Sequence, residues 1–68
     1  MVLNQVRAKR QEHNLTQEAL AHKVDVSRQT IIALEKGNYT PSVKLALLLA
    51  QVLNTTVDQL FWLEDEEN

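Results

Sequence analysis

The feature that most constrains the fold is a pair of helix-start signals that leave only two residues between one helix and the next. Thr16 and Ser27 both favour the N-cap position of a helix, and apolar residues with helical spacing follow each of them. The sequence therefore predicts helices over residues 16–24 and 27–36, joined by residues 25–26. So short a connection forces a sharp angle between the two helices, which is the geometry of a helix-turn-helix unit.

Apolar residues placed around both caps support these helix starts. Two pairs have the spacing of a hydrophobic staple, in which the residue before the cap packs on the helix; they are Leu15 with Leu20 and Val26 with Ile31. Gly37 follows the second run, where a left-handed residue commonly ends a helix. We therefore expect the helix-turn-helix unit over about residues 16–36.

Three further helical runs complete the expected fold. They cover residues 4–12, residues 41–53 and a short helix that begins at Thr56, where the sequence through Gln59 fits a capping box. Away from the two ends, no stretch of useful length alternates as a strand does. We expect one all-α domain of five helices over residues 1–68.

Composition excludes several classes of protein. The 68 residues contain no Cys, so disulfides and thiolate metal sites are excluded, as suits the reducing cytoplasm. His13 and His22 lack the paired spacing of a zinc site, so we expect no metal and no cofactor. The first four residues are too short for a signal peptide, and the apolar run over residues 45–53 falls far below the ~20 residues of a membrane span. We expect a soluble, cytoplasmic domain without a membrane partner.

The net charge of −2 at first argues against a nucleic-acid partner, but its distribution changes that conclusion. Four of the nine acidic residues form one run over residues 64–67, which is typical of a solvated terminus. All seven Lys and Arg residues precede that run, so residues 1–63 carry a net charge of +2. Binding to a polyanion depends on the field of one face rather than on the total charge.

The helix expected over residues 27–36 carries side chains that suit the reading of DNA bases. Its apolar stripe is formed by Val26, Ile31 and Leu34, so the residues between them point away from the core. Arg binds guanine bidentately, Gln binds adenine bidentately, and apolar side chains suit thymine methyl groups. The first turn of a recognition helix meets the base edges. The expected base contacts are therefore Arg28, Gln29, Thr30, Ile32 and Ala33.

Phosphate contacts are expected around the same two helices. Gln17 is the first residue of its helix, where the side chain and the backbone N–H together suit a phosphate. Asn38 and Tyr39 follow Gly37 and offer backbone amides, whereas Lys36, Lys44 and Arg7 are weaker candidates. The expected phosphate contacts are Gln17, Ser27, Lys36, Asn38, Tyr39 and Lys44.

Arg10 and Glu35 stand apart because each lies on the apolar side of its helix. A lone buried charge is strongly destabilising, so pairing the two would explain both positions. We expect a structural ion pair that ties the first helix to the end of the third and has no catalytic role.

Together these residues resemble the repressor/Cro (Xre) family of phage and bacterial helix-turn-helix regulators. The resemblance covers nearly the whole chain and rests on the joint spacing of Arg10, Leu15-Thr16-Gln17, Leu20-Ala21, Val26-Ser27-Arg28-Gln29-Thr30-Ile31, Leu34-Glu35-Lys36-Gly37, Pro41-Ser42 and Leu53. It implies a five-helix, lambda-repressor-like DNA-binding domain with a buried pair of Arg10 and Glu35. It also implies base contacts by Arg28, Gln29 and Ala33, and phosphate contacts by Gln17 and Asn38.

The chain departs from the family pattern at two positions. Asp25 stands where the family usually has Gly, and Asp accepts the left-handed conformation better than most residues. Ala33 stands where several relatives carry a longer polar side chain, so it offers only an apolar contact. The chain is also similar to the small stand-alone members of the cytolysin-repressor type. That similarity implies a two-stranded ribbon of residues 2–4 and residues 61–63.

The helix expected over residues 41–53 is apolar on more than one side, which predicts an interface. Its expected core stripe comprises Val43, Ala46, Leu47, Ala50 and Leu53, with Leu45 at the border. An apolar cluster near the end of the chain adds to the remaining side. The alternative is that this terminal segment folds back over the helix within one protomer. We expect a homodimer whose interface contains Leu48, Val52, Phe61, Trp62 and Leu63.

The expected function is sequence-specific binding of double-stranded DNA by a dimeric repressor of transcription. Its operator is expected to be an inverted repeat, because two-fold symmetry places one recognition helix in each of two successive major grooves. The alternative is a protein-interaction module, such as an antitoxin, in which DNA binding is secondary. Enzymatic activity is not expected, because the sequence offers no nucleophile–base pair, metal cluster or phosphate-binding loop.

Overall fold

The computed structural model describes residues 2–64, so Met1 and residues 65–68, which hold three of the four acidic-run residues, lie outside it. Residues 2–64 form β1 (Val2–Asn4), α1 (Val6–Glu12), α2 (Gln17–Lys23), α3 (Arg28–Glu35), α4 (Val43–Val52), α5 (Val57–Leu60) and β2 (Phe61–Leu63). In this part of the chain, no helix has the length and apolar character needed to cross a membrane. The expected fold of five helices is confirmed, and one short strand lies at each end of them.

The N-caps that defined the helix-turn-helix unit are present. Thr16 at α2 and Ser27 at α3 each accept a hydrogen bond from the backbone N–H three residues ahead, at 3.0 and 3.2 Å. Ser42 caps α4 in the same way at 3.1 Å. Each cap satisfies one of the backbone donors that the first turn of a helix leaves free. The starts of these three helices therefore follow from local sequence.

The capping box expected at α5 is wrong. Thr56 has the extended backbone of an N-cap, but its hydroxyl makes no capping hydrogen bond. The side-chain oxygen of Gln59 instead accepts a hydrogen bond from the Thr55 hydroxyl at 3.2 Å. The Gln59 side-chain oxygen is therefore bonded to Thr55, the residue before the N-cap, and the reciprocal hydrogen bonds of a capping box are not formed.

Left-handed residues follow the helices that make up the motif. Asp25, between α2 and α3, has a φ of 59°, and Gly37, after α3, has a φ of 81°. Asn14 and Asn54 have φ values of 57° and 55° after α1 and α4. Asn and Asp tolerate this region better than other residues with a Cβ. The expected tight turn and the expected stop at Gly37 are therefore confirmed.

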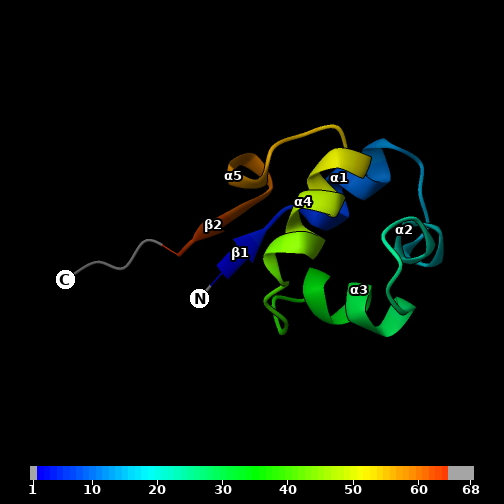
Figure 1. The fold of residues 1–68 in the computed structure, drawn as a ribbon, viewed down its shortest axis with the longest axis horizontal. Helices are drawn as coiled ribbons and strands as arrows, with labels where there is room; N and C mark the ends of the chain where they lie inside the picture. The colour runs from blue at the N-terminus through cyan, green and yellow to red at the C-terminus, as the bar shows by residue number, and fades with distance from the viewer. Residues whose placement is uncertain (1, 65–68) are drawn as a thin grey trace.

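The first helix begins at Val6, two residues later than expected. Asn4 belongs to β1, and its Oδ1 accepts a hydrogen bond from the Val6 N–H at 3.0 Å. β1 pairs antiparallel with β2, with Val2 opposite Leu63 and Asn4 opposite Phe61. Figure 1 shows this ribbon at one end of the molecule, with α2 at the other end. The ribbon that the family resemblance implied is therefore confirmed.

The helices share one apolar core that holds α3 in place. Leu15 and Val26, the outer residues of the two staples, are partly buried against it. Burial of each large aliphatic side chain contributes about 1.5–3 kcal/mol. The largest fully buried side chains are Leu20, Ile31, Leu34, Leu49, Leu53, Leu60 and Val6.

The expected core face of α4 is partly wrong. Val43 and Leu47, expected in the core, are 78% and 56% exposed. The helix is apolar at nearly every position, so the spacing of apolar residues does not fix which side turns inward. Tertiary packing selects the side that comprises Leu45, Ala46, Leu49, Ala50 and Leu53.

Candidate nucleic-acid interface

α3 presents the candidate base-reading residues on the side away from the core. Ile31 and Leu34 are fully buried and fix the helix against the other elements. Arg28 and Gln29 lie in the first turn and are exposed. Within residues 2–64, neither side chain forms an ion pair or hydrogen bond. Both are therefore free to bind another molecule.

The rest of this face carries smaller or apolar groups. Thr30, Ile32 and Ala33 are half-buried, so each keeps part of its surface toward the outside. The Thr30 hydroxyl lies 3.0 Å from the Ser27 hydroxyl, and one donates a hydrogen bond to the other. The Ser27 oxygen also accepts the Thr30 N–H. Ser27 is therefore engaged mainly in capping α3.

Arg10 and Glu35 form an ion pair that joins α1 to the last residue of α3. Arg10 Nε donates to Glu35 Oε2 at 2.7 Å, and Arg10 Nη2 donates to Glu35 Oε1 at 3.2 Å. The two side chains are only 11% and 5% exposed. Arg10 Nη1 also donates to the Leu15 carbonyl at 2.9 Å. Within residues 2–64, no buried side-chain nitrogen or oxygen lacks a partner, so this bidentate pair is internally satisfied.

Glu35 also holds the first residue of α2. Gln17 Nε2 donates to Glu35 Oε1 at 3.1 Å. A side-chain amide carries two donor hydrogens, so Gln17 retains one for a ligand. Gln17, the candidate phosphate contact, is therefore hydrogen-bonded to the same carboxylate that pairs with Arg10.

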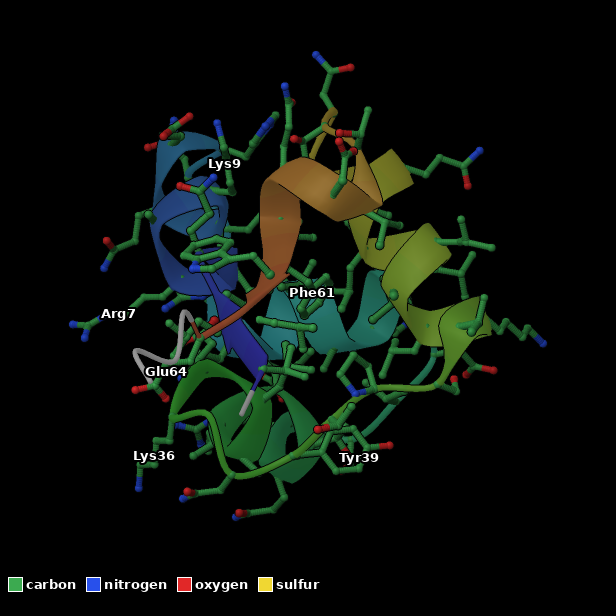
Figure 2. The ribbon with its side chains drawn as sticks, turned by 90° about the vertical axis from the view of Figure 1, so that its left-hand side faces the viewer. Arg7, Lys9, Lys36, Tyr39, Phe61 and Glu64 are labelled. Carbon is green, nitrogen blue, oxygen red and sulfur yellow. The ribbon has the colours of Figure 1, made fainter. Side chains whose placement is uncertain are left out.

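Basic residues flank this network. One hollow is lined by Arg7, Arg10, Gln17, Ile32, Glu35 and Lys36. Figure 2 shows Arg7 and Lys36 on the same side of the molecule, where Glu64 also lies and reduces the positive charge. Arg10 neutralises Glu35, so that carboxylate does not oppose an anion at the hollow. The geometry therefore strengthens Arg7 as a candidate phosphate contact.

The end of α3 corrects one expectation. The Gly37 N–H donates to the Leu34 carbonyl at 3.0 Å, and the Asn38 N–H donates to the Ala33 carbonyl at 2.9 Å. This pair of hydrogen bonds is the Schellman motif, which satisfies carbonyls at the helix end. The Asn38 backbone amide is therefore not free for a phosphate, and only its exposed side chain remains available.

The other candidate phosphate contacts are accessible, and only Lys36 shares the hollow with Gln17. Lys36, Asn38, Tyr39 and Lys44 are all exposed, at the end of α3, in the following loop and at the start of α4. Figure 2 places Tyr39 across the end of α3 from Lys36. Within residues 2–64, Lys9 pairs with Glu12 at 3.7 Å. The cations without an ion pair in this part of the chain are Arg7, Lys23, Arg28, Lys36 and Lys44.

Of the residues expected at a dimer interface, some pack against the core of their own protomer and others are exposed. Leu48, Val52 and Phe61 are partly buried against the core of their own protomer, and Figure 2 shows Phe61 directed toward the interior. Trp62 and Leu63 are 44% and 75% exposed. Neighbouring residues of a strand point to opposite faces, so Trp62 and Leu63 do not share one surface. Phe61 thus follows the alternative in which the terminal segment folds back.

The most exposed apolar side chains of α4 are Val43 and Leu47. Two hollows flank them, one toward the ribbon and one toward α5. Val2 lines the hollow next to the ribbon, and Leu63 pairs with Val2, so Leu63 lies on the same ribbon face. We call Val43, Leu47 and Leu63 the α4 apolar surface. The spacing of apolar residues did not predict the exposure of Val43 and Leu47, because it placed both in the core.

Asn4 forms a long-range hydrogen bond that the sequence did not indicate. Its side-chain Nδ2 donates to the Leu34 carbonyl at 3.0 Å, across thirty residues of chain. Short-range spacing carries no signal for a contact between a side chain and a distant backbone carbonyl. Asn4 therefore joins the ribbon to α3 without a recognisable motif.

Comparison with known proteins identifies the family of this chain. The chain matches the helix-turn-helix family over residues 6–60. An uncharacterized HTH-type transcriptional regulator of Methanocaldococcus jannaschii is 52% identical over 64 residues, which cover 94% of this chain and 97% of that protein. A second, from Archaeoglobus fulgidus, is 48% identical over 62 residues, or 91% of this chain and 89% of its own. YgzD of Bacillus subtilis, also an uncharacterized HTH-type transcriptional regulator, is 41% identical over 63 residues, or 93% and 96%.

A solved structure shows the same fold. The crystal structure of the clp gene regulator ClgR from Corynebacterium glutamicum superposes with a TM-score of 0.72 at 27% identity. The superposition covers 76% of this chain and 55% of ClgR, so this chain spans about half the length of that protein. With the family match over α1 to α5, the chain belongs to the Xre-type helix-turn-helix family of transcriptional regulators.

Proposed function

We propose that this protein is a cytoplasmic, sequence-specific repressor of transcription that binds an inverted-repeat operator in double-stranded DNA as a homodimer. The observation that carries the proposal is the orientation of α3. Ile31 and Leu34 fix its inner side, while Arg28 and Gln29 stay exposed in its first turn. In helix-turn-helix proteins, this turn of the second helix meets base edges in the major groove.

Arg28 and Gln29 suit different bases. The guanidinium of Arg28 matches the O6 and N7 acceptors of guanine, and the carboxamide of Gln29 matches N6 and N7 of adenine. Ile32 and Ala33 follow on the same face and provide apolar contact for thymine methyl groups, while Thr30 offers a hydroxyl. These side chains therefore supply the sequence preference.

The surrounding polar residues supply affinity. Gln17 presents its remaining amide hydrogen to a phosphate, and Lys36 and Arg7 add positive charge beside it. The side chains of Asn38 and Tyr39 extend the same role to the loop after α3, and Lys44 extends it to the start of α4. Contacts to phosphates position a protein on DNA without reading sequence. Binding through these cations should also weaken as salt concentration rises.

A second copy of the chain is proposed to cover the α4 apolar surface. Val43 and Leu47 expose most of their side chains between two hollows, and such exposed apolar groups favour association. One α3 reads too few base pairs for useful selectivity. Two copies related by a two-fold axis place their α3 helices about 34 Å apart, in successive major grooves. Half-buried Leu48 then lies at the edge of the interface, and Trp62 faces away from it.

Repression follows from occupancy of the operator. A dimer bound to two successive major grooves prevents another protein from using the same stretch of DNA. This mode of repression needs no contact with the transcription machinery, so a DNA-binding domain suffices for it.

The experiment that tests this function is selection of bound sites from a pool of random double-stranded DNA. We expect the selected sites to be inverted repeats. Arg28→Ala should then lose about 1–3 kcal/mol on the selected site and relax one base position in each half. Lys23→Ala is the matched control, because it also removes one exposed, unpaired cation but lies outside α3.

Two outcomes would contradict the proposal. If Arg28→Ala weakened the selected and scrambled sites by the same factor, as expected of Lys23→Ala, the base-reading role would be wrong. Selected sites that contain a single, unrepeated element would exclude the symmetric dimer.

A further inference from the structure

One side chain connects the start of the chain to the end of the recognition helix. Asn4 Nδ2 donates to the Leu34 carbonyl at 3.0 Å, and Asn4 Oδ1 accepts from the Val6 N–H at 3.0 Å. The Asn4 backbone meanwhile lies in β1, opposite Phe61 of β2. A single carboxamide therefore joins the ribbon, the start of α1 and the end of α3.

The Asn4 side chain bonds to a carbonyl at the end of α3 that already has a backbone hydrogen-bond partner. The Leu34 carbonyl accepts the Gly37 N–H at 3.0 Å as well as the Asn4 amide. Both lone pairs of that oxygen are therefore used. Since Asn4 is only half-buried, its role is to link two elements rather than to fill the core.

The same short strand also borders the α4 apolar surface. Val2, two residues before Asn4, lines the hollow beside Val43 and Leu47 and pairs with Leu63. Residues two apart in a strand point to the same face. β1 thus has one residue beside the proposed dimer surface and another bonded to the end of α3.

We propose that Asn4 is a positioning residue that sets the orientation of α3 relative to the dimer surface, and through it the spacing between operator half-sites. This inference rests on the proposed dimer. In a two-fold dimer, a rotation of α3 in one protomer also occurs in the other. Both rotations contribute to the change in separation between the two α3 helices. Half-sites must match a separation of about one helical turn of DNA, which makes half-site spacing sensitive to this contact.

The test compares two isosteric substitutions at neighbouring positions. Asn4→Asp keeps an oxygen for the Val6 N–H but removes the donor to the Leu34 carbonyl. Gln5→Glu is the matched control, because Gln5 Nε2 donates to the Gln59 carbonyl at 2.8 Å and, within residues 2–64, its side chain forms no hydrogen bond to α3. Both variants replace a carboxamide by a carboxylate at neighbouring positions, so both add one negative charge to the same segment.

Binding is measured on the selected inverted repeat and on repeats whose central spacer is one base pair shorter or longer. Wild-type protein and Gln5→Glu should prefer the selected spacing. For Asn4→Asp, the preference over the altered spacers should fall by about threefold or more, as expected for the loss of one hydrogen bond. The base preference within each half-site should stay unchanged, because Arg28 and Gln29 are untouched. A generally destabilised variant would instead weaken all spacers alike.

Equal spacing profiles for Asn4→Asp and Gln5→Glu, whether both sharp or both broad, would overturn the inference. A wild-type protein that binds all spacers equally would overturn the proposed dimer, and the inference with it, so the two failures are distinguishable. If circular dichroism shows Asn4→Asp to be unfolded, Asn4→Ser replaces it, with Gln5→Ser as its control, and the same comparison decides.

Discussion

The buried pair of Arg10 and Glu35 gives the sharpest test of how this small fold is held together. Two hydrogen bonds join side chains that are 11% and 5% exposed. Glu35→Leu leaves the guanidinium without its counter-charge, and breaking a buried pair from one side costs about 3–5 kcal/mol. Arg10→Met strands the carboxylate, but Gln17 still donates to it. We therefore expect the loss for Arg10→Met at the lower end, about 3 kcal/mol.

This loss is large relative to the stability of the whole domain. A chain of 68 residues has a free energy of unfolding of roughly 3–10 kcal/mol. A loss of about 3 kcal/mol corresponds to a Tm lower by roughly 12–24 °C in a domain of this size. Urea unfolding followed by circular dichroism measures the difference. One protein concentration must be used throughout, because the proposed dimerisation would make apparent stability depend on concentration.

The double variant, Arg10→Met with Glu35→Leu, separates charge from packing. Replacing a buried pair by apolar side chains of similar size is often neutral or stabilising by about 1–4 kcal/mol. Here the Leu15 carbonyl also loses its hydrogen bond from Arg10, which costs about 1–3 kcal/mol. The double variant should therefore unfold within about 2 kcal/mol of the wild type. The reasoning is refuted if the single variants melt like the wild type, or if the double variant loses the sum of both single losses.

Two further predictions concern the turn between α2 and α3 and the proposed dimer. Asp25→Gly should raise the free energy of unfolding by about 0.5 kcal/mol or more, because glycine adopts the φ of 59° without strain. Asp25→Ala should lower the free energy of unfolding. An unchanged urea midpoint for Asp25→Gly would contradict the reasoning. Leu47→Glu should yield monomers in sedimentation velocity at tens of micromolar and weaken operator binding, because it places a charge in the α4 apolar surface. Trp62→Glu, on the other face of the ribbon, is its control, and equal dissociation by both variants would place the interface elsewhere.

The helix-turn-helix unit could be predicted because its determinants are local. Thr16 and Ser27 satisfy backbone donors three residues ahead, and Gly37 takes the left-handed conformation that ends α3. Each of these interactions lies within a few residues, where side-chain type and backbone geometry are directly linked. The outer side of α3 then follows from its buried side.

The orientation of α4 could not be predicted from apolar spacing alone, because several stripes of this helix have a helical period. Its polar residues held the better signal. Lys44 and Gln51 are seven residues apart and therefore lie on one side of the helix, and both are exposed. Leu47 lies between them on that side, which explains its exposure. The positions of the two polar residues therefore indicate the exposed side of α4 better than the apolar residues do.

The contact between Gln17 and Glu35 joins two features that the sequence suggested separately, a structural ion pair and a phosphate contact. The two residues lie on different helices, eighteen residues apart, so no local pattern relates them. A bare carboxylate beside a phosphate would repel it, but Arg10 supplies the compensating charge. The neutral amide of Gln17 can then extend from this pair toward DNA. We therefore propose that Arg10 serves DNA affinity as well as stability, because the charge that holds α1 to α3 also compensates the carboxylate next to the proposed phosphate contact.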